Sequence, residues 1–436
     1  MTKAKAYLLF IFTLIIPSII HGQQLIPVGE GWANNSINTT VFRKNSLVTH
    51  NNTQFIAYYD PDGYMVLGKR DITSTEWSLH KSQYKGKVTD AHNSISIMVD
   101  GDGYLHVSWN HHGDPLSYAK GTMPYGLELT KKLPMTGISE NNVTYPEFFK
   151  MGDGSLIFMY RDGQSGQGNL VINKYDCKSK IWSQIQNNLI DGENKRNAYW
   201  QACVDNKGAI HISWVWRETP DVATNHDLCY ARSSDGGITW ENSKSEKYSL
   251  PITATTAEIV CHIPQNSELI NQTSMSTDNE GKPYIASYWR TENSDVPQYH
   301  VVYHDGKEWH DLNLGFRNTP FSLKGHGTKR IPISRPQIIA KQEREKTSLY
   351  LLFRDEERGE KASVAICKDL NNKKWEIKDL TNFPVNAWEP SYDTELWRTQ
   401  QKLHVFVQKV EQIDGEKTAD VTSQPVQVLE VEINIK

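Results

Sequence analysis

The sequence has few cysteines and, after its first two dozen residues, no long apolar run. Its 436 residues include five cysteines, too few and odd in number for the disulfide framework of a small exported domain. No later stretch approaches the ~18 apolar residues of a membrane-spanning helix. No long run of lysine or arginine occurs and the formal net charge is −4, which argues against a nucleic-acid partner. The stability of this chain must therefore come from a large buried core.

The first 22 residues have the pattern of a secretory signal peptide. Lys3 and Lys5 precede an apolar run over residues 6–20, and a polar sequence follows Gly22. The run is shorter than a membrane-spanning helix, and its flanks are those of a cleaved signal. We therefore predict a signal peptide over 1–22, secretion to the periplasm or the extracellular medium, and a soluble mature protein.

Helical periodicity is almost absent, whereas one strand-like segment recurs along the chain. The copies are NNTQFIAYYD at 51, GDGYLHVSWN at 101, GDGSLIFMYRD at 152, NKGAIHISWVWR at 206, NEGKPYIASYWR at 279, KTSLYLLFRD at 346 and QQKLHVFVQ at 400. Most form a tight hairpin with a preceding strand, and several are followed by a third strand and a Trp. Units of about 50 residues with about four strands are typical of β-propeller blades. The seven copies predict an all-β, seven-bladed β-propeller in a single domain over 23–436.

One turn resembles a known structural motif. The sequence SSDGGITW, from Ser233 to Trp240, is similar to the Asp-box of bacterial neuraminidase repeats. In such a turn the Asp and Gly residues form a compact loop. We expect Trp240 to pack between neighbouring sheets, which is a structural role.

A cluster of histidines lies on one predicted hairpin. The stretch DAHNSISIMVDGDGYLHVSWNHHG, which starts at residue 90, holds four of the fifteen histidines. Paired residues of an antiparallel hairpin have numbers with a constant sum. A turn near Gly101 then sets His92 opposite His111, with His112 beside them. His106 falls in mid-strand, where we expect it to pack between sheets.

The next hairpin, TYPEFFKMGDGSLIFMYRDG, brings a tyrosine and an arginine to the same end. By the same rule Tyr145 lies opposite Arg161, and both face the mouth that holds the histidines. Further strand ends reach this mouth around the ring. We predict substrate contacts at His111, Tyr199, Trp200, Arg217, His226, Asn271, Arg290 and Arg335, and the same face holds Arg354 and Trp388. Several arginines at one mouth, in a chain of net negative charge, indicate an anionic ligand.

Arginine, histidine and tyrosine together suit an elimination on an acidic sugar. The C5 proton of a uronate is weakly acidic, and a guanidinium on the carboxylate stabilises the developing enolate. A neutral His or an ionised Tyr can act as the base, and a Tyr or a protonated His as the acid to the leaving oxygen. A single His at a strand end is more often a surface group. Three on one hairpin, beside a Tyr–Arg pair, favour a catalytic site.

In these segments the chain resembles a known family. The histidine hairpin, the TYPEFF…MYRDG hairpin, NHDLCYARSSDGGITW and NQTSMSTDNEGKPYIASYWR are similar to the BNR-4 repeat propeller proteins, in particular to the ulvan lyases of polysaccharide lyase families 24 and 25. The resemblance covers nearly all of the mature chain. It implies a seven-bladed propeller that cleaves ulvan by elimination between a sulfated rhamnose and a uronic acid, leaving an unsaturated uronyl end.

The resemblance also implies a catalytic set, namely two His twenty residues apart and a Tyr followed sixteen residues later by an Arg. His92, His112, Tyr145 and Arg161 occupy the matching positions. Arg161 is then assigned to the substrate carboxylate. Tyr145 and one His, by preference His92, share the base and acid roles, and which group takes the proton stays open.

A structural metal ion, zinc or calcium, is sometimes present in such relatives. The residues that could hold one here are Cys229, Cys261 and His262, together with His226, but their spacing is not a recognised zinc pattern. Buried cysteines are the simpler interpretation. We expect no cofactor for catalysis, a monomer, and an anionic polysaccharide as the partner.

Two other functions fit the same fold. One is a glycoside hydrolase, since sialidases share the Asp-box and rhamnosidases that act next to glucuronate use a related propeller with a His at the site. The sialidase case is weakened because its arginine motif, echoed here at 330–332, lies near the start of a sialidase domain. The other is a non-catalytic sugar-binding propeller, because one fold serves many functions. The Asp-boxes do not discriminate, since they are structural in all three.

Overall fold

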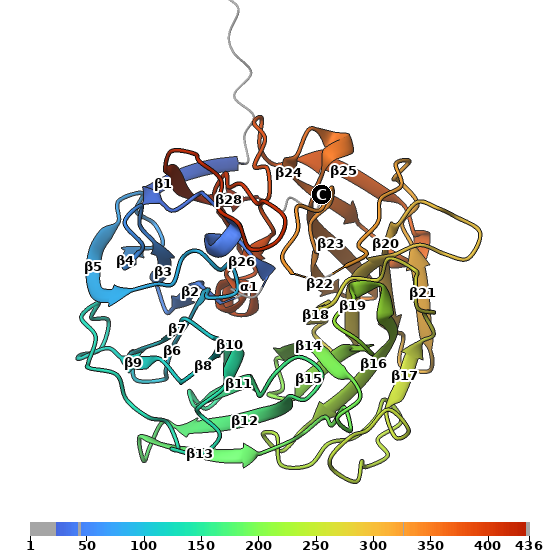
Figure 1. The fold of residues 1–436 in the computed structure, drawn as a ribbon, viewed down its shortest axis with the longest axis horizontal. Helices are drawn as coiled ribbons and strands as arrows, with labels where there is room; N and C mark the ends of the chain where they lie inside the picture. Colours follow the sequence, from blue (N-terminus) through green and yellow to red (C-terminus); the bar gives the residue numbers. More distant parts are fainter. Residues whose placement is uncertain (1–22, 42–44, 326, 433–436) are drawn as a thin grey trace, which may run out of the picture.

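The strands of the protein form seven sheets arranged in a ring. The computed structural model describes residues 23–41, 45–325 and 327–432. Figure 1 shows the ring face-on, with the chain passing from sheet to sheet in sequence order. The predicted seven-bladed β-propeller is therefore confirmed. The predicted signal peptide lies outside the described residues, and within them no helix is long and apolar enough to cross a membrane.

The first four sheets, or blades, contain strands that are nearly consecutive in sequence. Blade 1 holds β2 (Leu47–His50), β3 (Thr53–Tyr59), β4 (Tyr64–Asp71) and β5 (Ser78–Lys85); blade 2 holds β6 (Ile95–Val99), β7 (Leu105–Trp109) and β9 (Tyr118–Lys120). Blade 3 holds β10 (Val143–Lys150), β11 (Leu156–Asp162), β12 (Asn169–Asp176) and β13 (Ile181–Gln186), with β8 (His112–Asp114) added beside β10. Blade 4 holds β14 (Asn197–Val204), β15 (Ile210–Arg217), β16 (Asn225–Ser233) and β17 (Glu258–Cys261).

The last three blades complete the ring. Blade 5 holds β18 (Ser274–Thr277), β19 (Pro283–Trp289), β20 (Gln298–His304) and β21 (Trp309–Asn313). Blade 6 holds β22 (Gln337–Glu343), β23 (Lys346–Asp355), β24 (Lys361–Cys367) and β25 (Trp375–Asp379). Blade 7 holds β26 (Ser391–Tyr392), β27 (Leu403–Val407), β28 (Gln424–Val431) and β1 (Gln23–Gly31), with α1 (Thr394–Gln400) between β26 and β27. Short 3₁₀ helices lie at Ser36–Asn38, Val222–Thr224, Glu356–Arg358 and Leu370–Asn372.

The seven recurrent sequence segments each form the second strand of a blade, as predicted. These strands are β3, β7, β11, β15, β19, β23 and β27. Their side chains alternate between two faces, and a neighbouring blade covers each face. Every residue of β7 and β15 is therefore buried.

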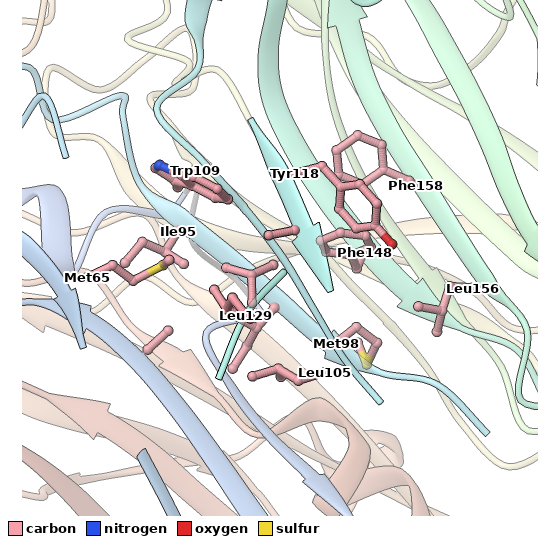
Figure 2. Packing of buried hydrophobic residues seen from close by; sticks show 14 of the residues in the cluster. Met65, Ile95, Met98, Leu105, Trp109, Tyr118, Leu129, Phe148, Leu156 and Phe158 are labelled. Atoms are coloured by element: carbon pink, nitrogen blue, oxygen red, sulfur yellow. The ribbon is translucent and has the colours of Figure 1, made fainter. Parts of the chain in front are cut away.

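Large apolar side chains fill the space between adjacent blades. Figure 2 shows Met65 of blade 1 against Ile95 of blade 2, and Phe148 and Phe158 of blade 3 beside Tyr118 of blade 2. The ring centroids of Phe148 and Phe158 are 4.6 Å apart. Burial of such side chains is the main favourable term in folding. It places the core between the blades, so the polar ends of the strands face the mouths of the ring.

Aspartates hold two of the turns between first and second strands. The Oδ1 atom of Asp100 accepts hydrogen bonds from two backbone N–H groups of its turn (3.0 and 2.9 Å), and Oδ2 lies 3.2 Å from Nε2 of His106. Asp205 repeats the arrangement with His211, whose Nε2 lies 3.1 Å from Oδ2. His106 is fully buried, which agrees with its predicted packing role. These Asp–His pairs are therefore structural.

The SSDGGITW turn of blade 4 has the expected compact form. Asp235 accepts hydrogen bonds from the backbone N–H groups of Ile238 (3.1 Å) and Thr239 (2.9 Å). Trp240 is only 1% exposed, and its Nε1 donates to the carbonyl of Gly237 (3.0 Å). Trp240 packs in a cluster with residues of blades 3 and 4, as predicted.

The first and last strands of the described chain close the ring. β1 is the outer strand of blade 7 and pairs antiparallel with β28, so that Gln23 lies opposite Val431 and Leu25 opposite Leu429. Neither this strand nor α1 was predicted from the repeats. α1 lies close to the ring centre (Figure 1) and, with the last residues of β10, β14 and β18, lines a small cavity at one mouth. The opposite mouth, where these strands begin, holds the predicted site residues.

Candidate active site

A cavity of about 260 Å³ opens at the mouth where the first strands of the blades begin. Its walls include the predicted residues His92, His112, Tyr145, Arg161, Tyr199, Arg217, Asn271 and Arg335. Thr328, Lys329 and Glu416, from loops of blades 5–6 and 7, complete part of the rim. The structure thus brings together all four residues predicted as catalytic and half of those predicted as substrate contacts.

The histidine hairpin has a register one residue away from the predicted one. Ser96 pairs with Ser108, because the turn contains five residues. Past the paired residues, Asn110 has φ of +64° and His112 pairs with Thr144 of β10, which leaves His112 beside His92. Their rings stack with centroids 3.9 Å apart and planes 18° apart. The two histidines that resemble the catalytic pair are thus in direct contact.

His111, predicted as a substrate contact, lies outside the cavity. It is fully buried, and its Nε2 accepts a hydrogen bond from the backbone N–H of Ser117 (2.8 Å). Burial lowers the pKa of His111 to about 3, so the ring is neutral. Asn110, with φ of +64°, ends β7, and His112 then pairs with β10, so His111 does not continue the predicted hairpin.

Asp90 joins the two stacked histidines. Its Oδ1 lies 2.7 Å from Nδ1 of His92, and its Oδ2 lies 2.7 Å from Nδ1 of His112. Oδ1 also accepts the backbone N–H of His92 (2.9 Å). Burial alone would raise the pKa of Asp90, but the hydrogen bonds from His112 and His92 outweigh burial and hold that pKa well below its ordinary value. Asp90 is therefore an ionised acceptor shared by both rings.

Tyr145 reaches the cavity from a β-bulge in β10. Thr144 pairs with Arg161, and the register shifts before Glu147, so Tyr145 and Pro146 lie in the bulge. Tyr145 has φ of +55°, a left-handed conformation that is rare for residues other than glycine. The predicted register holds from Glu147 to the turn, but the predicted pairing of Tyr145 with Arg161 is wrong, because the bulge sets Thr144 opposite Arg161.

Arg161 lies beside the Tyr145 ring. Its guanidinium carbon is 4.9 Å from the ring centroid, and the residue is only 7% exposed. Its Nε has no hydrogen-bond partner, and none of the described carboxylates forms an ion pair with it. A nearly buried guanidinium without a counter-ion at a cavity wall is suited to an anionic ligand.

A second Tyr–Arg pair continues the wall in blade 4. The guanidinium carbon of Arg217 lies 5.4 Å from the ring centroid of Tyr199, and the rings of Tyr199 and Tyr145 are 6.1 Å apart. Nε of Arg217 donates to the carbonyl of Thr219 (3.0 Å), which fixes the side chain. Two tyrosines therefore share the positive field of two arginines.

The two tyrosines differ in their tendency to ionise. Burial, with the neighbouring Tyr199, raises the pKa of Tyr145 well above its ordinary value, although Arg161 opposes the change. Burial also disfavours the ionised form of Tyr199, but Arg217 and Arg161 outweigh burial and leave the pKa of Tyr199 below its ordinary value. Tyr145 is therefore a proton donor at neutral pH, and Tyr199 is the more readily ionised ring.

Arg335 differs from Arg161 because it has a counter-ion. Its Nε and Nη2 each lie 2.8 Å from an oxygen of Glu389, and its Nη1 donates to Oε1 of Gln272 (3.1 Å). Glu389 and Gln272 thus hold the guanidinium in place, and Glu389 neutralises its charge. Arg335 shapes the cavity wall, but because of Glu389 it adds less positive charge to the cavity than an unpaired arginine would.

Three other predicted substrate contacts do not line this cavity. Trp200 follows Tyr199 in β14 and therefore points to the other face, where it packs in the core between blades 3 and 4. His226 is held by Glu218 (2.9 Å) and Asp227 (3.0 Å). Arg290 donates to the carbonyl of Asn266. Arg354 and Trp388, also expected at this face, are buried, and Arg354 donates to the Trp388 carbonyl.

The residues proposed for a metal ion do not converge. Cys261 pairs with Leu228, whereas Cys229 pairs with Ile259, so the two cysteines belong to clusters on opposite faces of blade 4. The His262 side chain is 82% exposed. This set does not fit a zinc or calcium site.

Within the described ranges, Asp90, His92 and His112 form the one His/Cys/Asp/Glu group whose ligand atoms lie close enough to hold a metal ion. An ion bound to an imidazole nitrogen lies near the plane of that ring. The two rings are nearly parallel and stacked, so their planes do not meet at a common ion. The geometry therefore favours hydrogen bonding to Asp90 over metal ligation.

Two functional candidates escaped the sequence reasoning. Asp90 lies two residues before His92, and this Asp-x-His spacing in the sequence could have indicated it. Glu416 lies in the loop after β27, and its Oε1 accepts hydrogen bonds from the backbone N–H and Oγ1 of Thr328 (2.8 and 2.6 Å). No repeat or motif marks Glu416 in the sequence. Its loop reaches the cavity only because the seven blades close into a ring.

Comparison with known proteins gives one family and several relatives. The model of the BNR repeat-containing family matches residues 53–317. The ulvan lyase of Nonlabens ulvanivorans is 24% identical over 287 residues, 55% of this chain and 58% of that protein. The long isoform of the ulvan lyase of Alteromonas sp is 26% identical over 196 residues, 40% of this chain and 20% of that protein. The chain spans less than two thirds of the length of these curated relatives.

Solved structures of polysaccharide lyases share the fold. The polysaccharide lyase Uly1 superposes with a TM-score of 0.67 at 16% identity, over 95% of this chain and 100% of that chain. A PL25 ulvan lyase bound to a GlcA(1-4)Rha3S unit superposes with a TM-score of 0.67 at 14% identity, over 92% of this chain and 95% of that chain. At these identities the likeness establishes the fold alone.

Proposed function

Because the chain belongs to the BNR repeat-containing family, we propose that it is a polysaccharide lyase that cleaves ulvan by β-elimination at a uronate. Ulvan lyases among the relatives support the substrate class. A superposed ulvan lyase is bound to a glucuronate–rhamnose sulfate unit, which supports a uronate at the site.

The observation that carries the proposal is the environment of Arg161. A guanidinium that is almost buried, and that no described carboxylate neutralises, lies 4.9 Å from the ring centroid of Tyr145 and lines the same cavity as the stacked histidines. A uronate carboxylate would supply the missing counter-ion. The same contact would stabilise the charge that develops on that carboxylate when C5 loses its proton.

The elimination balances without a cofactor. The C5–H bond breaks and its proton passes to a base on the protein, while the electron pair forms the C4–C5 double bond. The C4–O4 bond breaks, and the leaving oxygen takes a proton from an acid. Tyr145 and His92 share these roles. The raised pKa of Tyr145 favours a protonated phenol, which suits the acid, and an imidazole lone pair of the His92–His112 pair then suits the base.

Secretion is the localisation that we propose for this enzyme. The support is the sequence of residues 1–22, with its basic start and short apolar run. A large polysaccharide cannot reach an enzyme inside an intact cell, so export agrees with the proposed substrate. Fractionation of cells that express the full chain, followed by N-terminal sequencing of the exported protein, would test it. A full-length protein confined to the cytoplasm would contradict it.

The proposed reaction is tested by incubating the protein with ulvan and following ultraviolet absorbance. An elimination creates an unsaturated uronate that absorbs in the ultraviolet, so absorbance and reducing ends should rise together. Reducing ends without absorbance would show a hydrolase. Binding without either signal would show a sugar-binding propeller.

Replacement of Arg161 by alanine tests whether its guanidinium binds the substrate carboxylate. Arg161→Ala should lower kcat/KM by about 10³-fold or more, because a charge contact in the transition state is lost. The matched control is Arg344→Ala, at an exposed turn between β22 and β23. Circular dichroism should show both variants folded with wild-type Tm. Equal activity of Arg161→Ala and Arg344→Ala would overturn the assignment.

A further inference from the structure

We propose that Asp90 is a positioning residue whose carboxylate holds both His92 and His112 in the Nδ1–H tautomer. The basic lone pair of each ring is then on Nε2, the nitrogen remote from Asp90. The inference rests on the proposed lyase function and deepens it, because it makes the two imidazoles a single unit with defined proton positions. Asp90 itself does not touch the reacting atoms.

The geometry of the unit assigns one carboxylate oxygen to each ring. Oδ1 of Asp90 lies 2.7 Å from Nδ1 of His92, and Oδ2 lies 2.7 Å from Nδ1 of His112. An ionised carboxylate has only acceptor sites, so each Nδ1 must carry the proton of its hydrogen bond. Both distances are those of charge-assisted bonds. One side chain thus fixes two tautomers.

Stacking makes the two rings interdependent. Their centroids are 3.9 Å apart, so a positive charge on one ring strongly opposes a second charge on the other. Asp90 supplies one negative charge next to both rings, and its two oxygens hold the rings in this stacked arrangement.

Other charged and titratable groups face the unit from neighbouring segments. Glu416 places Oε1 3.6 Å from Nδ1 of His92, and the Tyr145 ring centroid lies 6.1 Å from that of His92. Asp114 Oδ2 accepts the backbone N–H of His112 (3.3 Å), and Asp114 is itself paired with Lys87. None of these side chains bridges both imidazoles. Asp90 is distinguished by that bridge.

The structural Asp–His pairs of this fold differ from the Asp90 unit. Asp100 and Asp205 are buried, and each uses one oxygen for two backbone N–H groups of a turn. In Asp90, by contrast, one oxygen binds the His92 ring and the other binds the His112 ring, and both rings line the cavity. Its local turn is also held by backbone bonds, since the Asn93 N–H donates to the Asp90 carbonyl (3.1 Å). The carboxylate can therefore be changed while that turn is kept.

The direct test reads the tautomers by long-range ¹H–¹⁵N NMR of protein labelled at histidine. Spectra of His92→Gln and His112→Gln assign the two rings. In the wild-type protein both rings should be Nδ1–H. In Asp90→Asn the amide NH₂ must donate to one Nδ1 while the amide oxygen accepts from the other, so one ring should become Nε2–H.

A matched control carries the same charge change on a neighbouring residue. Asp114→Asn removes a carboxylate near His112 that does not bond to either ring, so both rings should stay Nδ1–H. Two results would overturn the proposal: an Nε2–H tautomer of either ring in the wild-type protein, or unchanged tautomers in Asp90→Asn. A change of Tm alone in Asp90→Asn would make Asp90 structural. These measurements need no substrate, so they stand or fall independently of the ulvan assay.

Kinetics then connect the tautomers with the reaction. If ulvan is cleaved, Asp90→Asn should lower kcat by about 100-fold or more with little change in KM, because a misplaced proton impairs acid–base transfer and leaves binding intact. Asp114→Asn should retain kcat. A rise in KM with normal kcat would place Asp90 in substrate binding and contradict its positioning role.

Discussion

Tyr145 shows how a single backbone conformation can orient a reactive side chain. Its φ of +55° is unfavourable for a tyrosine, and it immediately precedes a proline. The bulge holds this conformation because the strand pairs regularly on both sides of it. The result is a phenol that leaves the sheet and meets Arg161 and Tyr199. Local strain is thus offset by the rest of blade 3.

Removal of the Tyr145 hydroxyl separates its chemical role from its packing role. Tyr145→Phe keeps the ring against Arg161 and should fold normally. We expect kcat on ulvan to fall by about 10²–10⁴-fold, the usual contribution of one proton transfer. Steady-state kinetics and a thermal melt provide the measurement. Retained kcat would show that the acid or base is a different group.

His111 gives the protein an acid-sensitive buried site. The folded-state pKa is about 3, below the ordinary value of 6.5, because burial disfavours the charged ring. The unfolded chain therefore binds the proton more readily. The neutral ring therefore makes its full contribution to the free energy of unfolding above about pH 6.5. This contribution is lost as the pH falls towards 3.

The variant His111→Gln should reveal this pH dependence. Its side chain retains an acceptor and does not titrate, so the free energy of unfolding of the wild type relative to the variant should shrink as the pH falls from 7 to 4. The slope should approach about 1 kcal/mol per pH unit. Urea unfolding at several pH values measures it. A constant difference would show that folding does not change the pKa of His111.

At the scale of the element, hairpins and turns determine where side chains arrive. The second strands and their Gly/Asp turns were predictable from sequence, because short, largely apolar runs bounded by such turns are typical of strands covered on both faces. The bulge at Tyr145 was not predictable, and neither was the left-handed Asn110 that ends β7 and leads His112 to β10. Both depend on backbone conformations that no single residue type dictates. The end of β7 at Asn110 leaves His111 buried outside the site.

The Asp-box turn of blade 4 is expected to stabilise the fold without affecting catalysis. Asp235→Ala removes the acceptor of the Ile238 and Thr239 N–H groups, and should lower the free energy of unfolding by about 1–3 kcal/mol. Activity on ulvan at low temperature should be unchanged. The control is Asp62→Ala, an exposed carboxylate paired only with Lys81. Equal stability of the two variants would contradict a structural role for this turn.

At the scale of the whole molecule, the cavity exists only because the ring is closed. His92 comes from the loop before blade 2, His112 from β8 beside blade 3, Tyr145 and Arg161 from blade 3, and Glu416 from the loop after β27 of blade 7. The repeats predicted the number of blades and the face of the site. They could not predict Glu416 or the pairing of β1 with β28, since both depend on contacts between distant parts of the chain.

Closure by β1 should be necessary for stability. A chain that begins at residue 32 lacks β1 and exposes the edge of β28, so we expect a lower Tm and aggregation through the unpaired edge. The matched control begins at residue 23 and lacks only the predicted signal peptide. Thermal unfolding and size-exclusion chromatography compare the two. A monomer of unchanged Tm without β1 would show that the other contacts of blade 7 suffice.

The pairing of Gln23 with Val431 makes the two ends of the described chain neighbours in one sheet. The two ends could therefore be joined and the chain opened at another loop, and the blades would keep the same order around the ring. A circular permutant that joins residues 432 and 23 through a short linker, and starts between two other blades, would retain every strand pairing of the ring. In such a permutant His92 and His112 could be encoded near the end of the chain and still meet Tyr145 across the same cavity.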